Sequence, residues 1–256
     1  MKKDYILFID SGIGGLSTLC KIYKTLPANY IYFADIKNAP YGNKSPDKIY
    51  ECLKEIIISV SKKYNIKIVV LACNTATTTS INKLRDEFCK IHFVGAEPAI
   101  MLAYKLNYRH ILCVATNSTI KQKKYQHLVS SLNADIKSLG LKSFAKNIED
   151  YFCHKSIWAY FECLKIIYKI ASKSSNFDCL VLGCTHYVFF QNLIKKITNK
   201  PTLDGNLGVF KQVCFWHAKL NMNKSINSTL KFLFSFNQKH STQIYKKIFH
   251  EILAKV

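Results

Sequence analysis

Two similar segments of the chain each place a cysteine beside polar side chains. The first reads Leu71-Ala-Cys-Asn-Thr-Ala-Thr77, and the second reads Leu182-Gly-Cys-Thr-His186. Each follows an apolar run typical of a buried parallel strand, and a helical pattern follows each one. Open α/β sheets bind ligands where strands end, and N–H groups at a helix N-terminus favour a thiolate. We therefore expect Cys73 and Cys184 to be two reactive thiols facing one cleft.

The chain contains ten cysteines, and a free cysteine is usually a small buried hydrophobe. Cys73 and Cys184 differ because their neighbours, Asn74, Thr75, Thr185 and His186, can orient a small ligand. No C-x-x-C or paired Cys/His spacing occurs, so we expect no metal site, and unpatterned thiols suit a reducing cytoplasm. The remaining eight are expected in the core: Cys20, Cys52, Cys89, Cys113, Cys153, Cys163, Cys179 and Cys214.

Glycine is scarce, yet three of the nine glycines crowd into Asp10-Ser-Gly-Ile-Gly-Gly-Leu-Ser17 after the first apolar run. This loop is not G-x-G-x-x-G, and a carboxylate beside a phosphate is unfavourable, so Asp10 better suits an ammonium group. A second turn, Ala39-Pro-Tyr-Gly-Asn-Lys-Ser45, can offer a tyrosine and N–H groups to an anion, although a plain turn is an equal reading. Together these groups fit an amino acid.

Two thiols flanking an amino-acid α-carbon, with no lysine motif for a pyridoxal Schiff base, indicate racemisation. One base returns its proton only to the face it came from, so inversion needs a thiolate opposite a thiol. A free cysteine has a pKa near ~8.5 and is mostly protonated at neutral pH, so the site must favour the thiolate. Asp10 and His186 are the nearby candidates for that role.

Alternating strand-like and helical segments predict a mostly parallel α/β architecture. Ser45-Pro46 predicts a capped helix start. Trp158, Phe161, Leu164 and Tyr168 recur at helical spacing and are expected in the core. The paired motifs favour two pseudo-symmetric lobes, with residues 1–97 and 208–256 in the first and 98–207 in the second. The predicted strands are Tyr5–Ile9, Tyr30–Ala34, Ile66–Ala72, His92–Gly95, His110–Ala115, Cys179–Gly183 and Leu230–Phe234.

Charge and hydropathy limit the class of protein. The net charge of +21 invites a nucleic-acid role, but only Arg85 and Arg109 among the 37 basic residues are arginine, and base readout leans on arginine. The lysines are also spread along the chain, so we expect a solvated surface and no specific nucleic-acid partner. No apolar stretch approaches the roughly 20 residues of a membrane span, and the N-terminal segment reads as a strand rather than a signal peptide.

Five motifs in order resemble those of bacterial glutamate racemases, in the aspartate/glutamate racemase superfamily. They are Asp10-Ser-Gly-Ile-Gly-Gly, Pro40-Tyr-Gly-Asn-Lys, Ala72-Cys-Asn-Thr-Ala, Glu97-Pro98 and Leu182-Gly-Cys-Thr-His186, and the resemblance extends from residue 6 to about residue 208. It implies a cofactor-independent cytoplasmic isomerase that supplies D-glutamate for peptidoglycan, and it leaves a homodimer open. The chain departs from the family pattern at Thr77-Thr-Thr79 and at Tyr187-Val-Phe-Phe190.

The resemblance also implies roles for particular residues. Cys73 would act on D-glutamate and Cys184 on L-glutamate, and Glu149 matches an acidic position near the family's histidine. The implied substrate contacts are Asp10, Ser11, Tyr41, Gly42, Asn74, Thr75, Thr116, Thr119, Thr185 and His186. Two rivals remain: an aspartate racemase or another enzyme of this fold, and a basic protein associated with nucleic acid.

Overall fold

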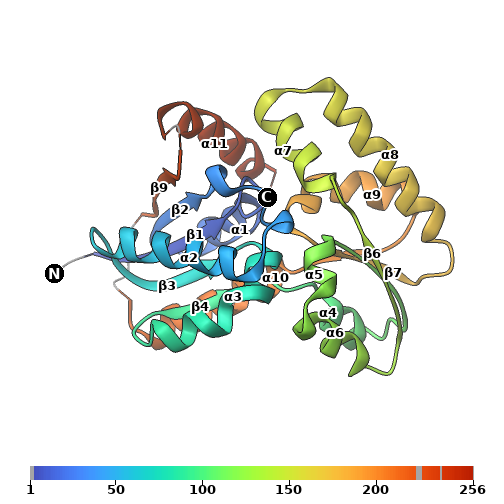
Figure 1. Ribbon diagram of the computed structural model, residues 1–256, viewed down its shortest axis with the longest axis horizontal. Coiled ribbons are helices and arrows are strands. Elements are labelled where there is room, and N and C mark those ends of the chain that lie inside the picture. Colours follow the sequence, from blue (N-terminus) through green and yellow to red (C-terminus); the bar gives the residue numbers. More distant parts are fainter. Residues whose placement is uncertain (1–2, 223–226, 237, 256) are drawn as a thin grey trace. The chain divides into compact units, whose positions relative to one another are not determined.

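The computed structural model describes residues 3–222, 227–236 and 238–255. The chain divides into two compact units (Figure 1). The first unit comprises Met1–Ala96 and Asn206–Val256, and the second comprises Glu97–Gly205. Each unit is built on a sheet of parallel strands flanked by helices. The predicted α/β class with two parallel-sheet lobes is confirmed.

The sheet of the first unit has the strand order β4-β3-β1-β2-β9, and all its pairs are parallel. Alternate residues of each strand point to opposite faces, and the inner strands β1, β2 and β3 are buried on both faces, which explains why they read as nearly continuous apolar runs. The edge strand β9 is only partly buried. The strands are β1 (Asp4–Asp10), β2 (Asn29–Ala34), β3 (Asn65–Leu71), β4 (His92–Gly95) and β9 (Thr229–Phe234).

The sheet of the second unit has the order β6-β5-β7-β8 and is also wholly parallel. Leu112, Val114, Leu180 and Leu182 pack on one face, whereas Ile111, Cys113, Cys179 and Val181 pack on the other. This alternation places a separate hydrophobic cluster on each side of the sheet. The strands are β5 (His110–Ala115), β6 (Asp135–Gly140), β7 (Cys179–Gly183) and β8 (Thr202–Asp204).

The two sheets share one topology. In each unit the first strand along the chain is central in the sheet. The second strand pairs with one side of it and the third strand with the other side, and the fourth strand pairs with the third. Cys73 lies two residues after β3, and Cys184 lies directly after β7. Each cysteine therefore follows the third strand of its sheet. The internal similarity predicted from the two cysteine motifs is therefore present in the fold of the units.

Helices cover these sheets (Figure 1). In the first unit they are α1 (Leu16–Thr25), α2 (Pro46–Ser61), α3 (Asn74–Glu87), α10 (Asn206–Lys219) and α11 (Gln238–Leu253), with short 3-10 turns η1 (Ile36–Asn38) and η2 (Tyr41–Asn43). In the second they are α4 (Ile100–Lys105), α5 (Asn117–Lys121), α6 (Lys123–Ser130), α7 (Phe144–His154), α8 (Ile157–Lys173), α9 (Gln191–Thr198) and the 3-10 helix η3 (Thr185–Phe190). Among the described residues, each helix is too short or too polar to cross a bilayer.

Helix α2 begins as predicted. The Ser45 side chain accepts a hydrogen bond from the Lys48 N–H at 3.3 Å, and Pro46 occupies the first helical position, where it loses no helical hydrogen bond. The apolar face of the helix then packs on the first sheet through residues that include Ile49, Leu53 and Ile57. The cap and the apolar face fix where the preceding turn of residues 39–45 must end.

The predicted aromatic core stripe on α8 is wrong. Trp158, Phe161 and Tyr168 are 71%, 53% and 61% exposed. The charged residues Glu162, Lys165, Lys169 and Lys173 lie along one side of this helix and mark its outward face, which the spacing of the aromatic residues alone does not identify. The face that packs on the sheet carries smaller side chains, because Ala159, Cys163, Ile167 and Ile170 fill the space there.

Three cysteines also depart from the predicted burial. Cys89 is exposed, and Cys153 and Cys214 are half-buried. Cys89 lies just after α3, where its thiol donates to the Asp86 carbonyl, so it is placed by a local turn rather than by the core. The other five cysteines expected in the core are buried.

Candidate active site

Cys73 occupies the N-cap position of α3, two residues after the end of β3. Asn74 and Thr75 are the first two residues of that helix, and all three side chains are buried. The first N–H groups of a helix lack intrahelical partners and carry partial positive charge, so a thiolate at this position is favoured. The strand therefore fixes where the thiol lies, and the helix N-terminus favours its ionised form.

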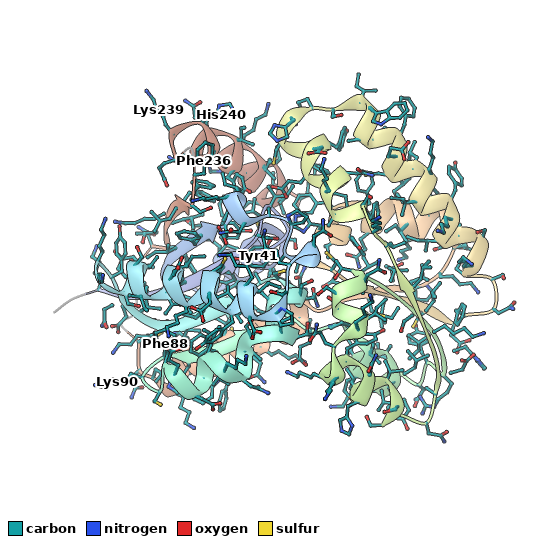
Figure 2. The ribbon with its side chains drawn as sticks, in the orientation of Figure 1. Tyr41, Phe88, Lys90, Phe236, Lys239 and His240 are labelled. Atoms are coloured by element: carbon teal, nitrogen blue, oxygen red, sulfur yellow. The ribbon has the colours of Figure 1, made fainter. Side chains whose placement is uncertain are left out.

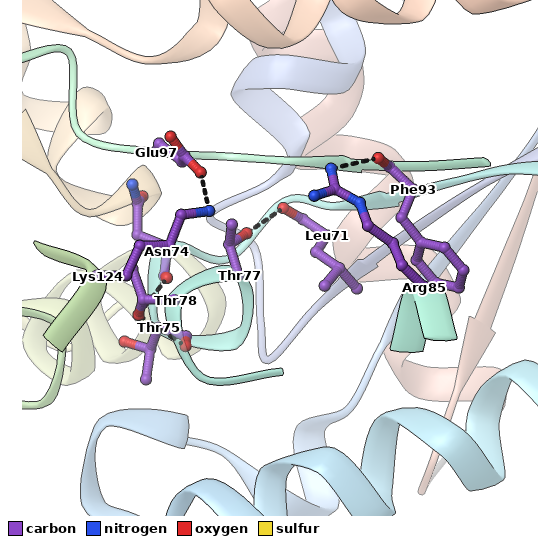
Figure 3. A network of polar contacts seen from close by, with 9 residues as sticks. All are labelled: Leu71, Asn74, Thr75, Thr77, Thr78, Arg85, Phe93, Glu97 and Lys124. Carbon is purple, nitrogen blue, oxygen red and sulfur yellow. Dashed lines mark hydrogen bonds and ion pairs between the residues drawn. The ribbon is translucent and has the colours of Figure 1, made fainter. Parts of the chain in front are cut away.

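The three threonines that depart from the family pattern donate hydrogen bonds to backbone carbonyls of α3 or β3, and Figure 3 draws those of Thr77 and Thr78. Thr77 Oγ1 donates to the Leu71 carbonyl at 3.1 Å, and Thr78 Oγ1 donates to the Asn74 carbonyl at 3.0 Å. Thr79 Oγ1 donates to the Thr75 carbonyl at 2.9 Å. These hydroxyls brace the first turns of α3 and the end of β3, so the departure affects how the Cys73 segment is held rather than which groups it presents.

Asp10 lies at the same edge of the first sheet as Cys73. In the register of the sheet Asp10 pairs with Ala34 and Ile9 pairs with Leu71, so the loops after β1, β2 and β3 share that edge. Asp10 is fully buried, and its Oδ1 accepts from the Gly12 N–H at 2.9 Å. Ser11 is also buried. The structure thus brings a carboxylate and the Cys73 segment to one edge of one unit.

One of the glycines that crowd after β1, Gly15, has a packing reason. A Cβ placed on Gly15 would lie 2.6 Å from the Cβ of Ala72 and 3.1 Å from the hydroxyl of Tyr32. Ala72 directly precedes Cys73, so the close approach that the glycine permits is between the first loop and the cysteine segment. This close approach is a contact within the chain and supplies no evidence for a phosphate.

The Tyr41 side chain is committed to the protein. Its hydroxyl donates to Asp35 Oδ2 at 2.7 Å, and its ring lies in the hydrophobic cluster that also contains Cys73 (Figure 2). Burial, together with the charge and hydrogen bond of Asp35, raises the pKa of Tyr41 well above its usual range. A substrate contact from this turn would therefore come from backbone groups such as those of Gly42 rather than from the phenol.

Cys184 follows β7 directly and is the N-cap of η3, whose first residues are Thr185 and His186; all three side chains are buried. His186 Nε2 donates to Glu149 Oε2 at 2.7 Å, and His186 is also hydrogen-bonded to the Cys184 thiol. Burial opposes the imidazolium, but the bonds to Cys184 and Glu149 and their charges outweigh it, so the pKa of His186 lies well above its usual range. The structure therefore joins Cys184, His186 and Glu149 into one hydrogen-bonded chain.

Thr116 follows β5, the strand beside β7, and the neighbouring residues Ala115 and Gly183 are paired in the sheet. Thr116 caps α5 by accepting from the Thr119 N–H at 3.2 Å, and the two threonine hydroxyls lie 3.0 Å apart. Thr119 is fully buried. Both threonines thus belong to the edge of the second sheet that carries Cys184, with Thr119 held beneath Thr116.

The predicted site residues therefore form two clusters, each within one unit. The Cys73 cluster contains Asp10, Ser11, Tyr41, Gly42, Cys73, Asn74 and Thr75, and the Cys184 cluster contains Thr116, Thr119, Glu149, Cys184, Thr185 and His186. Each cluster offers one thiol, a means of favouring its thiolate, and polar groups that can hold an amino acid. In the part of the chain that the structure describes, no group of three His, Cys, Asp or Glu side chains could hold a metal ion.

Sequence reasoning missed two residues of these clusters. Asp35 is buried and accepts from the Tyr41 hydroxyl and from Asn38 Nδ2, so it fixes the turn of residues 39–43. Its signal was a carboxylate directly after the apolar strand β2, much as Asp10 is a carboxylate at the end of β1. Cys153 contacts Glu149, and its signal was a spacing of four residues on a helix.

The chain resembles known glutamate racemases in sequence, although no protein-family model matches it. It is 37% identical over 212 residues to a glutamate racemase of Clostridium botulinum, covering 80% of this chain and 81% of that protein. It is 33% identical over 253 residues to a glutamate racemase of Clostridium kluyveri, covering 95% and 96%.

A solved structure agrees with the sequence relatives. The structure of Escherichia coli glutamate racemase in complex with L-glutamate and the activator UDP-MurNAc-Ala matches with a TM-score of 0.82 and 25% identity, covering 98% of this chain and 96% of that one. The sequence relatives exceed 30% identity and span most of both chains, and the fold agrees along nearly the whole length. The chain belongs to the glutamate racemase family.

Proposed function

We propose that the chain interconverts L-glutamate and D-glutamate without a cofactor, with Cys73 and Cys184 as the two acid/base groups. The single observation that carries this proposal is the equivalent position of the two cysteines, after the third strand of sheets that share one topology. Each thiol has polar neighbours and a group that favours its ionised form. Membership of the glutamate racemase family supports the reaction and the substrate.

The proposed chemistry requires the thiols to act on opposite faces of the α-carbon. With D-glutamate bound, the Cys73 thiolate removes the α-proton and the Cys184 thiol donates a proton to the other face. With L-glutamate bound, Cys184 is the base and Cys73 the acid. The negative charge that develops on the substrate between these steps must be stabilised, and hydrogen-bond donors around its carboxylate supply that stabilisation.

The two thiols are supported differently. His186 is hydrogen-bonded to Cys184, and Glu149 favours its imidazolium form. The positive charge of that imidazolium would stabilise the Cys184 thiolate. The Cys73 thiolate gains from the N-terminus of α3.

We assign the remaining residues by their chemistry. Asp10 would accept hydrogen bonds from the substrate ammonium group. The substrate carboxylates would be held by hydroxyl and amide groups of Ser11, Asn74, Thr75, Thr116 and Thr185. Gly42 contributes backbone N–H, and Tyr41 and Thr119 hold their segments in place. Glutamate is thus the small-molecule partner. The product, D-glutamate, would supply peptidoglycan synthesis in the cytoplasm, the role of this family.

Single serine variants test the proposal. Cys73→Ser and Cys184→Ser should each lose roughly 10²-fold to 10⁴-fold in kcat, because a hydroxyl is a much weaker acid than a thiol. Cys20→Ser and Cys113→Ser are matched controls, since both thiols are fully buried in the two units and lie outside the clusters. The readout is D-glutamate formed from L-glutamate by purified protein without added cofactor.

Three results would contradict the proposal. A Cys184→Ser enzyme that kept more than about a tenth of wild-type turnover would exclude the two-thiol mechanism, since loss of a positioned acid/base group costs at least roughly 10²-fold. A wild-type enzyme that racemised L-aspartate faster than L-glutamate would assign the site to the shorter substrate. Activity abolished by a chelator and restored by a metal ion would overturn the cofactor-free reaction.

A further inference from the structure

We propose that Cys153 is a positioning residue, whose thiol holds the Glu149 carboxylate in the orientation that faces His186. Cys153 is a half-buried thiol that contacts Glu149 of the Cys184 cluster, and the proposed reaction does not use it. It rests on the proposed function in one respect, because the rate it affects is that of the racemisation assigned above.

The geometry places Cys153 and Glu149 one helical turn apart. Both lie on α7, four residues apart, and side chains at this spacing share one face of a helix. A helical side chain leans toward the N-terminus, so Cys153 leans over the position of Glu149. Cys153 Sγ lies 3.5 Å from Glu149 Oε1, while Glu149 Oε2 accepts from His186 Nε2 at 2.7 Å. The two carboxylate oxygens therefore have different partners.

The thiol of Cys153 is the donor in this contact. Burial and the nearby charge and hydrogen bond of Glu149 raise the pKa of Cys153 far above its usual range, so the sulfur keeps its proton. An ionised carboxylate only accepts hydrogen bonds, and a thiol is a weak donor. The S–H group thus points its proton at Oε1 and leaves Oε2 for the imidazole.

The terminal torsion of a glutamate side chain is broad, so separate contacts to its two carboxylate oxygens help to fix the plane of the group. The neighbouring Lys146 does not serve this purpose, since its ammonium pairs with Asp150 at 2.6 Å. Cys153 supplies the second contact. Holding the plane of Glu149 keeps a lone pair of Oε2 directed at His186 Nε2, which leaves Nδ1 of the same ring for the Cys184 thiol.

Loss of this contact should slow proton transfer without weakening substrate binding. A thiol is a weaker donor than the groups that usually bond to carboxylates, so Cys153→Ala should lower kcat by roughly 3-fold to 10-fold and leave KM nearly unchanged. Cys153→Ser keeps a donor and should recover most of the loss. Cys163→Ala is the control, because Cys163 is a fully buried thiol of α8 whose loss perturbs only packing.

A double-mutant cycle separates positioning from general packing. If Cys153 acts through Glu149, then Cys153→Ala should add no further loss of kcat to a Glu149→Ala enzyme. A full additional loss in that background would overturn the proposal, because it would show that the thiol acts on the rate by another route. The same variants measured for thermal unfolding show whether stability follows a different pattern from kcat.

Nitrogen-15 NMR of the histidine rings gives a readout that does not depend on turnover. The His186 signals, assigned by their absence in His186→Asn, should shift or divide between two ring states in Cys153→Ala and return toward wild type in Cys153→Ser. Unchanged His186 signals in Cys153→Ala would overturn the proposal. A wild-type protein that fails to racemise glutamate would instead refute the proposed function, whereas these signals would still report on Cys153.

Discussion

Replacing Glu149 by glutamine tests the electrostatic support of Cys184 most sharply. The substitution keeps the size of the side chain but removes the charge that faces His186 Nε2 at 2.7 Å. Burial of His186 remains, and burial alone disfavours the imidazolium. Glu149→Gln should therefore lower the pKa of His186 and leave the Cys184 thiolate without a cation beside it.

The size of the effect follows from how deeply the pair is buried. The His186 side chain is 8% exposed and that of Glu149 is 21% exposed. Breaking a fully buried ion pair costs about 3–5 kcal/mol. Because Glu149 is partly exposed, the expected cost of breaking this pair is about 2–3 kcal/mol. If the whole loss appears in the transition state, it corresponds to about 30-fold to 150-fold in kcat.

The pH dependence of stability has a definite sign. Folding raises the pKa of His186, so the folded protein holds this proton more tightly than the unfolded chain does. The stabilisation is complete below the ordinary histidine pKa of about 6.5 and is lost as pH rises through the raised value. The difference in unfolding free energy between wild type and Glu149→Gln should therefore shrink as pH rises above about 6.5.

The assay compares kcat for both directions with an NMR titration of His186, using Asp150→Asn as the matched control. Asp150 is the adjacent carboxylate on α7, but it pairs with Lys146 rather than with a residue of the Cys184 cluster. Asp150→Asn should keep wild-type kcat. Equal activity of Glu149→Gln and Asp150→Asn, together with an unchanged His186 titration, would refute the assigned role of the Glu149 charge.

Three further predictions address the framework around the site. Gly183→Ala should lower kcat on the order of 10²-fold, because the added Cβ would lie 2.8 Å from the Ala115 Cβ and would displace the end of β7 before Cys184. Gly208→Ala is the control and should leave kcat unchanged, because a Cβ at Gly208 meets nothing within 4 Å. Tyr41→Phe should cost about 1.5–3 kcal/mol in urea unfolding, because the buried Asp35 loses a donor. Burial raises the pKa to about 12 for four thiols, those of Cys20, Cys113, Cys163 and Cys179. Above about pH 9 these thiols ionise in the unfolded chain but not in the folded protein, so the unfolding free energy should fall by up to about 1.4 kcal/mol per pH unit for each of them.

The buried strands could be predicted because both faces of each sheet are covered, which forces continuous apolar runs such as Ile66–Leu71. The edge strands β6 and β8 could not. β6 is only partly buried, so Asp135, Lys137 and Ser138 interrupt its apolar pattern, and β8 has only three residues. Edge strands of this kind carry too little hydrophobic periodicity to be recognised from one sequence.

The site was predictable where local sequence carries the chemistry. Cys73 and Cys184 each follow a strand beside polar residues, and the structure places both at helix N-caps. The contact between Glu149 and His186 joins residues 37 positions apart, so spacing could not reveal it, and only the family resemblance suggested it. The exposed aromatic residues of α8 show the converse limit, because large apolar side chains at helical spacing do not by themselves identify the buried side of a helix.

The transfer of solvent deuterium during racemisation tests the two-thiol mechanism most directly. Protonated L-glutamate is incubated with the wild-type enzyme in deuterated water, and both enantiomers are isolated at low conversion and examined by mass spectrometry. Two thiols on opposite faces predict D-glutamate with deuterium at the α-carbon, while the recovered L-glutamate keeps its proton. Product that retains the original α-proton, or recovered substrate labelled as fully as product, would show a single base serving both faces and would contradict the mechanism.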